Sequence, residues 1–233
     1  MLLLSKFPTA VLTAAALLQL SAPAAHAQSQ QPTQQEMQCG SLKNAYGPFD
    51  YRTGKKFLEI VEEYHFNAAT ENLIRPMGGH FGGDFDYTLR ASPNHHRALI
   101  SLARYAERTN SDQLRDAKYS VTCYFDRAIR FAPDDMIVRM IYAGHLGRTN
   151  RVDQARQQLD FVARAVTDSP FTHYSLGSSY FDIKQYDKAL HHAHKAQALG
   201  FPRTELRDAL RKVGKWVEPV AVMPAASAAS GAG

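Results

Sequence analysis

Histidine is the residue type in this chain best suited to metal chemistry. The 233-residue sequence contains ten histidines, and three of them fall close together at His191, His192 and His194. On a helix, His191 and His194 lie one turn apart on the same face, where two imidazoles can share a transition-metal ion. Lys188 and Lys195 flank them, and their positive charge opposes a bound cation. We therefore expect no metal here and keep His191 and His194 as the ligands of an alternative, a metal-handling protein.

Motifs for other catalytic chemistry are missing from the sequence. It has no GxSxG turn, no HExxH motif and no CxxC pair, and its acidic residues show no two-carboxylate arrangement. Glycines cluster at residues 78–83, but their spacing is not that of a nucleotide-binding loop, and no strand is expected before them. We interpret this cluster as a turn between helices. The prediction is a protein that is not an enzyme and uses no cofactor.

The first 27 residues are typical of a secretory signal. Lys6 provides the positive start, residues 8–20 are almost wholly apolar and small, and residues 25–27 (AHA) form a small-x-small cleavage pattern. An uncleaved anchor is the alternative, although the apolar run is short for a bilayer span. Removing this segment takes away one lysine and lowers the net charge from +5 to +4. We predict a periplasmic protein with a flexible lead-in at residues 28–38 and a disordered tail at residues 218–233.

Cys39 and Cys123 are the only two cysteines. An oxidising compartment favours a disulfide between them. On the chain-entropy model, closing a loop of about 85 residues stabilises the fold by ~4 kcal/mol. A free buried thiol at Cys123 and a disulfide between two chains are the alternatives.

The strongest pattern in the sequence is a repeat of 34 residues. Asp153 and Asp187 each begin an Asp-x-Ala unit at this spacing, and residues 142–143 (YA) align with residues 176–177 (LG) at the same offset. A third copy begins near His96 and has about six extra residues in the polar run 108–115. Ser169 before Pro170 is typical of a helix start. Each copy is expected to form an antiparallel helix pair in which small residues let the helices approach.

These residues resemble the tetratricopeptide repeat family. The best copy spans residues 171–202, where the matching residues are Leu176, Gly177, Tyr180, Tyr186, Asp187, Lys188, Ala189, Ala196 and Pro202. The resemblance implies an all-α fold, a short right-handed α-solenoid of three helix-turn-helix repeats at residues 96–202. An irregular N-terminal helical region at residues 39–95 and a capping helix at residues 203–217 would complete it. Three stacked copies are about the minimum for a stable solenoid.

The resemblance also implies a function. Members of the family commonly hold a segment of a partner protein on the concave face, which is lined by the first helix of each pair. The corresponding positions here are Arg97, Ile100 and Arg104 in the first copy, Ile137, Met140, Gly144 and Arg148 in the second, and Phe171, Tyr174, Ser178, Phe181 and Asp182 in the third. Core packing is the alternative role of Met140 and Phe181. The implied protein is an adaptor or scaffold in a periplasmic envelope assembly, and an accessory subunit of an envelope enzyme is the alternative.

The basic residues are dispersed and are not interleaved with aromatic side chains, so we expect no nucleic-acid partner. Five of them decorate the expected capping helix: Arg203, Arg207, Arg211, Lys212 and Lys215. We interpret these as a solvated face, and weak contact with an anionic envelope surface is the alternative. The sequence makes no prediction of an oligomeric state.

Overall fold

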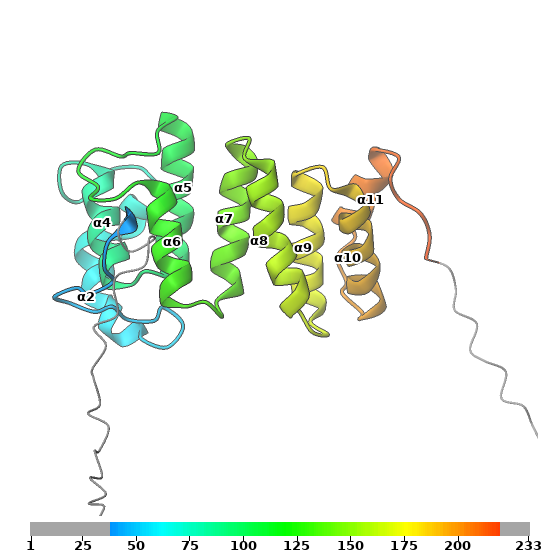
Figure 1. Ribbon diagram of the computed structural model, residues 1–233, viewed down its shortest axis with the longest axis horizontal. Coiled ribbons are helices and arrows are strands. Elements are labelled where there is room, and N and C mark those ends of the chain that lie inside the picture. The colour runs from blue at the N-terminus through cyan, green and yellow to red at the C-terminus, as the bar shows by residue number, and fades with distance from the viewer. Residues whose placement is uncertain (1–37, 220–233) are drawn as a thin grey trace, which may run out of the picture. The chain divides into compact units, whose positions relative to one another are not determined.

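The computed structural model describes residues 38–219, and within that range the chain forms helices and no strand (Figure 1). The predicted all-α class is therefore confirmed. No described helix has the length and apolar content that crossing a membrane requires. The predicted signal segment, nearly all of the lead-in and all but two residues of the tail lie outside the described residues. The helices are α2 (Lys55–His65), α3 (Ala68–Glu71), α4 (Phe81–Ala91), α5 (His96–Thr109), α6 (Val121–Phe131), α7 (Met136–Arg148), α8 (Val152–Ala165), α9 (Pro170–Asp182), α10 (Tyr186–Ala198) and α11 (Glu205–Lys212).

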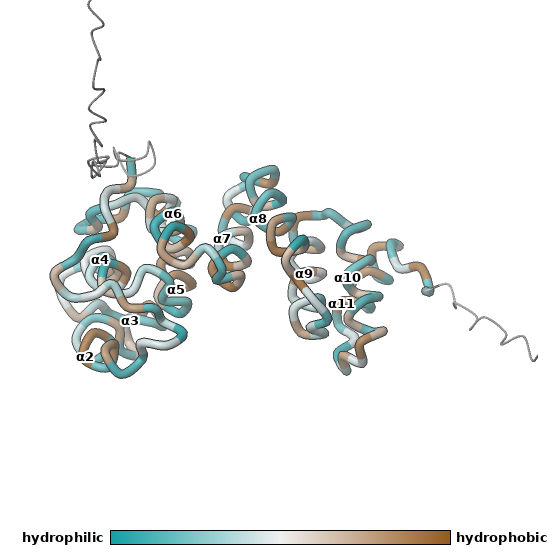
Figure 2. Tube along the Cα trace, turned by 60° about the horizontal axis from the view of Figure 1, so that its bottom comes forward, coloured by the Kyte–Doolittle hydropathy of each residue, from teal (hydrophilic) through white to brown (hydrophobic). Residues whose placement is uncertain are grey.

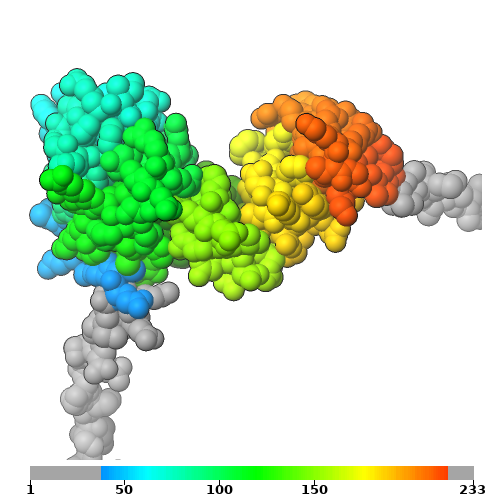
Figure 3. Space-filling model, turned by 90° about the horizontal axis from the view of Figure 1, so that it is seen from above, coloured from blue at the N-terminus to red at the C-terminus, as the bar shows by residue number. Residues whose placement is uncertain are grey.

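From α5 onward the helices pack against one another in chain order (Figure 1). α7 pairs with α8 and α9 pairs with α10, while α5, α7 and α9 contact each other in succession. α11 packs against both α9 and α10. Figure 2 places α5, α7 and α9 along one side of this row, and Figure 3 shows that the row is hollowed on that side.

Burial recurs with the spacing of the sequence repeat. The second helices of successive pairs carry fully buried residues 34 positions apart: Val121, Ala155 and Ala189 in one set, and Ala128, Val162 and Ala196 in another. All of these residues except Ala196 belong to one continuous core that extends from Phe66 to Leu210. Each helix pair therefore buries the same face against its neighbours.

The helix ends follow local side-chain chemistry. The Ser169 hydroxyl accepts a hydrogen bond from the Thr172 N–H, and Pro170 occupies the first turn, as the sequence predicts. α11 ends at Lys212 and is therefore shorter than the predicted capping helix at residues 203–217. Gly214 adopts a φ of +68°, and the Lys215 N–H donates to the Leu210 carbonyl oxygen. This left-handed glycine ends the helix early.

The glycine cluster contributes to a helix as well as to a turn. α4 begins at Phe81 and includes Gly82 and Gly83, so the interpretation of residues 78–83 as a turn is wrong for the last three. A Cβ on Gly82 would lie 2.1 Å from the carbonyl oxygen of Arg115. The glycine is needed there because the loop between α5 and α6 crosses directly over the start of α4.

The N-terminal segment is anchored to α6 by two kinds of bond. Cys39 and Cys123 form the predicted disulfide within the chain. Arg127, one turn further along α6, is 1% exposed and donates from Nη1 to the carbonyl oxygens of Cys39 and Ser41 at 3.0 and 2.7 Å. Its guanidinium lies over the ring of Tyr119. Burial lowers the pKa of Arg127, and backbone carbonyls provide the hydrogen bonds that its buried charge requires.

Candidate protein-binding face

The predicted groove positions other than Phe181 lie on three parallel stripes of α5, α7 and α9, and Arg108 completes the stripe on α5. Each stripe occupies the second, fifth, ninth and thirteenth positions of its helix, which fall on one side of a helix with 3.6 residues per turn. We call these twelve residues the inner face. They are Arg97, Ile100, Arg104 and Arg108 in α5, Ile137, Met140, Gly144 and Arg148 in α7, and Phe171, Tyr174, Ser178 and Asp182 in α9.

The apolar residues of the inner face lie in the first half of each helix. Ile100, Ile137 and Phe171 are 42%, 46% and 62% exposed. Met140 and Tyr174 are partly buried and pack against the core. Ile137 and Phe171 stand at matching positions of α7 and α9, and Ile100 lies one turn further along α5. Exposed apolar side chains grouped in this way form a surface that a partner can cover.

Tyr174 and Phe181 have structural partners of their own. The ring of Tyr174 packs against Phe201 at 4.7 Å between centroids, and the Arg203 guanidinium lies over the Tyr174 ring at 5.2 Å from its centroid. The ring of Phe181 meets that of Tyr186 edge-on at 5.5 Å. Truncating either side chain would therefore disturb packing as well as the face.

Apart from Arg97 at the start of α5, the charged residues of the inner face lie in the second half of the same helices. The Arg148 Nε donates to Glu107 Oε2 at 2.8 Å, and the Arg148 guanidinium lies beside Gly144, where a Cβ would be 3.2 Å from Nη1. The Asp182 side chain is exposed to solvent. Surrounding protein atoms nevertheless raise the pKa of its carboxyl, and the charge of Arg148 opposes that increase.

Three of the predicted groove positions share one pocket. A cavity of about 420 Å³ between α7 and α9 is lined by Gly144, Gly147, Arg148, Ser179, Asp182 and Ile183. Ser178 lies beside it, but its hydroxyl donates to the Tyr174 carbonyl oxygen at 3.0 Å. The pocket thus offers a guanidinium, a carboxylate and a hydroxyl beside two glycines and the side chain of Ile183.

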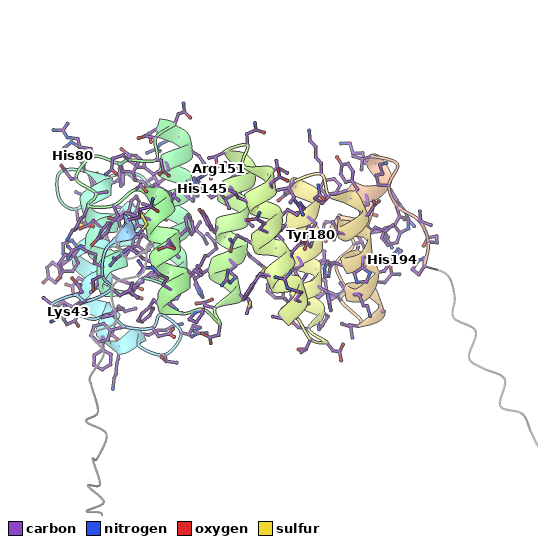
Figure 4. The ribbon with its side chains drawn as sticks, in the orientation of Figure 1. Lys43, His80, His145, Arg151, Tyr180 and His194 are labelled. Carbon is purple, nitrogen blue, oxygen red and sulfur yellow. A yellow bond between two sulfur atoms is a disulfide. The ribbon has the colours of Figure 1, made fainter. Side chains whose placement is uncertain are left out.

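A second pocket contains residues that the sequence did not single out. It has a volume of about 540 Å³ and lies where the C-terminal ends of α5 and α7 meet. Figure 4 shows His145 and Arg151 close together at this end of α7. His145 is 2% exposed, and its Nδ1 lies 3.0 Å from Glu107 Oε1. Burial lowers the pKa of His145, while Glu107 opposes that shift. Because the two residues lie 38 positions apart, no local pattern links them.

The two candidate metal ligands of α10, His191 and His194, have different surroundings. The His194 Nε2 lies 2.8 Å from the Val217 carbonyl oxygen, and its ring meets Trp216 edge-on (Figure 4). His191 is exposed. Within residues 38–219, no group of three or more His, Cys, Asp or Glu side chains could hold a metal ion.

His192 forms a buried pair with a histidine that the sequence left without a partner. Its Nδ1 lies 2.9 Å from the Nδ1 of His173, so that one ring donates and the other accepts. Burial, followed by the nearby His191, His173 and Lys188, lowers the pKa of His192 to about 4. The pair is therefore neutral at pH 7 and joins α9 to α10.

A polar cluster also joins the segments before α2, α5 and α7. The Asn94 amide donates to Asp50 Oδ1 and Asp135 Oδ2, both at 2.9 Å, and the His96 Nε2 lies 2.7 Å from Asp135 Oδ2. Burial alone would raise the pKa of Asp135, but the hydrogen bonds from His96 and Asn94 bring it below the usual value. Asp135 also caps α7 through the N–H groups of Ile137 and Val138. The cluster sets the position of the inner-face helices.

Comparison with known proteins identifies no relative. No protein-family model, no curated protein and no solved structure matches the chain.

Proposed function

We propose that the chain is a periplasmic adaptor that holds a segment of a partner protein on its inner face. The observation that carries this proposal is the alignment of three stripes on α5, α7 and α9. Exposed apolar residues lie in the first half of these helices and, apart from Arg97, charged residues lie in the second half. An accessory subunit of an envelope enzyme would use the same face and would differ only in the identity of its partner.

The proposal includes a tetratricopeptide-like solenoid. The pairing of α7 with α8 and of α9 with α10 supports it, as do the buried residues that recur every 34 positions. Asp135 and Ser169, which cap α7 and α9, stand at the same spacing. In such a stack the first helices face the concave side, where an extended segment can touch several repeats at once.

The exposed apolar residues supply the driving force for binding. Burying an isoleucine or phenylalanine side chain that was fully exposed contributes about 1.5–3 kcal/mol. Ile100, Ile137 and Phe171 are about half exposed, so covering all three contributes a few kcal/mol before the cost of ordering the partner. This magnitude suits a reversible adaptor.

Crosslinking in a periplasmic extract tests the proposal. The purified mature protein would be compared with an Ile137→Ser, Phe171→Ser variant, because these two side chains are the most exposed of the apolar set and their loss spares the core. Ile74→Ser, which changes a side chain that is 76% exposed and off the inner face, is the matched control. We expect partner yield to fall at least fivefold in the double variant and to stay unchanged in the control. Equal yields from all three proteins would contradict the proposal.

A further inference from the structure

The charges on the inner face are sorted along the row of helices. α5 contributes three arginines to the face, α7 contributes Arg148, and α9 contributes no basic residue and one acid, Asp182. The face is therefore positive toward α5 and negative toward α9.

Only some of these charges are neutralised by the chain itself. Arg97 pairs with Glu71 and Glu62, and Arg148 pairs with Glu107. Arg104 and Arg108 form no ion pair with any described residue, although the Arg108 guanidinium lies over the ring of Tyr105. Asp182 likewise has no ion-pair partner in residues 38–219. Two positive charges on α5 and one negative charge on α9 are left for a ligand.

The spacing of these charges translates into a sequence spacing in a ligand. Packed helices lie about 8–10 Å apart, so α5 and α9 are separated by roughly 16–20 Å across α7. An extended segment advances about 3.3 Å per residue and covers that distance in five or six residues. Gly144, at the middle of the face, has no side chain of its own, and the guanidinium of Arg148 lies beside it.

We infer that the inner face binds an extended segment of a partner protein that carries Asp or Glu residues at one end and a Lys or Arg about five or six residues away. The acidic end contacts Arg104 and Arg108, and the basic end contacts Asp182. Apolar side chains between them cover Ile137 and Phe171. This inference rests on the proposed function and specifies the chemistry of its partner.

Phage display tests the inference. A library of random 12-residue peptides is selected for binding to the immobilised mature protein. We expect the enriched peptides to combine acidic and basic residues at this spacing with apolar residues between them. The most enriched peptide, synthesised with a fluorescent label, should bind at least tenfold more weakly to an Arg104→Glu, Arg108→Glu variant in an anisotropy titration. Arg75→Glu with Arg115→Glu makes the same change in net charge away from the inner face and should leave binding unchanged. Asp182→Lys should exchange the preference at that end from basic to acidic residues.

The possible failures separate the two proposals. Enriched peptides that require Ile137 and Phe171 but bind the Arg104→Glu, Arg108→Glu variant as well as the unmodified protein would overturn the charge inference alone. Peptides whose binding is unchanged by Ile137→Ser with Phe171→Ser, or a selection that enriches no sequence, would overturn both.

Discussion

The helices before and after the end of α6 are held together by different kinds of interaction. The N-terminal region, α2–α6, has helices of unequal length and a long crossing loop, and it is tied by the disulfide, the buried Arg127 and the Asn94 cluster. The C-terminal region, α7–α11, consists of short-linked helices whose apolar contacts run between neighbours. Irregular segments cannot reuse one apolar contact pattern, so covalent and polar bonds hold them in place.

The polar bonds of the N-terminal region join segments that are distant in sequence. The fully buried His95 places its Nε2 2.9 Å from Glu62 Oε1, which connects the start of α5 to α2. Arg97 then bridges from α5 to Glu62 and Glu71. Such bonds between distant segments are rarer in the C-terminal region. One example there is the Asp160 carboxylate of α8, which binds both the Tyr180 hydroxyl of α9 and the Lys188 ammonium of α10. The irregular region thus anchors one end of a face that the regular region extends.

Of the changes proposed here, removing the disulfide should lower the free energy of unfolding most, and it should do so through the N-terminal region. The bridge spans 84 residues of sequence, and a Cys39→Ser, Cys123→Ser variant should lose about 4 kcal/mol of unfolding free energy on the chain-entropy model. Urea denaturation measures the loss, and amide hydrogen exchange should locate it in α2–α6 rather than in α9–α10. Reductant should destabilise the unmodified protein to the level of the variant and leave the variant unchanged. A loss below about 1 kcal/mol, or equal loss of protection throughout, would contradict the contrast.

Acid should act on the C-terminal region through His192. Its folded pKa of about 4 lies below the unfolded value of 6.5, so the unfolded chain binds this proton first as the pH falls. The contribution of His192 to the free energy of unfolding is therefore fully present above pH 6.5. It decreases by about 3 kcal/mol as the pH falls toward 4. In the N-terminal cluster, Asp135 has a lowered pKa, and its contribution is lost only below the unfolded value near 3.8.

Urea unfolding of a His192→Phe variant at pH 7 and at pH 4.5 measures the contribution of His192. The variant should lose less stability between the two pH values than the unmodified protein does. Gln197→Ala, on the exposed side of α10, removes no titratable group, so it is the matched control and should keep the full pH dependence. Identical pH dependence in the His192→Phe variant and the unmodified protein would show that the buried pair does not titrate as described.

Adjacent glycines of α4 test how closely the backbone packs in the N-terminal region. Gly82→Ala places a methyl group against the Arg115 carbonyl oxygen, and we expect a loss of about 2 kcal/mol because the crossing loop must move. Gly83→Ala meets Asp116 at an ordinary 3.6 Å and should gain several tenths of a kcal/mol from helix propensity. Thermal unfolding compares the two. Equal melting temperatures would mean that the loop does not press on Gly82.

The smallest expected effect concerns two glycines of the C-terminal region. A Cβ on Gly177 would lie 2.6 Å from the Leu206 side chain and 3.2 Å from the Ala189 carbonyl oxygen, so Gly177→Ala should cost about 1 kcal/mol. Gly144→Ala meets only the flexible end of Arg148 and should be neutral or slightly stabilising. Trp216 fluorescence during urea unfolding distinguishes them. A Gly177→Ala variant at least as stable as Gly144→Ala would indicate that α11 packs more loosely against α9.

Local patterns predicted the elements that depend on neighbouring residues. The 34-residue spacing of small and apolar residues indicated the helices from α7 to α10, and Ser169 before Pro170 marked the start of α9 correctly. The glycine cluster was misinterpreted because the need for a glycine at position 82 comes from the carbonyl oxygen of Arg115. That residue lies more than thirty positions away in the sequence. The end of the capping helix was placed too late because helical periodicity continues past Lys212, whereas Gly214 stops the backbone hydrogen bonds.

The sequence by itself therefore predicted the all-α class and the pairing of the only two cysteines, which follow from periodicity, residue type and count. Its resemblance to a repeat family implied the stripes of the inner face, except for Arg108. Neither inference needs knowledge of distant contacts. Only the tertiary structure decided that His192 pairs with His173, that Glu107 engages both His145 and Arg148, and that Arg104, Arg108 and Asp182 remain without ion-pair partners among the described residues. Ion pairing depends on which side chains folding brings within a few ångströms, and spacing along the chain does not encode that.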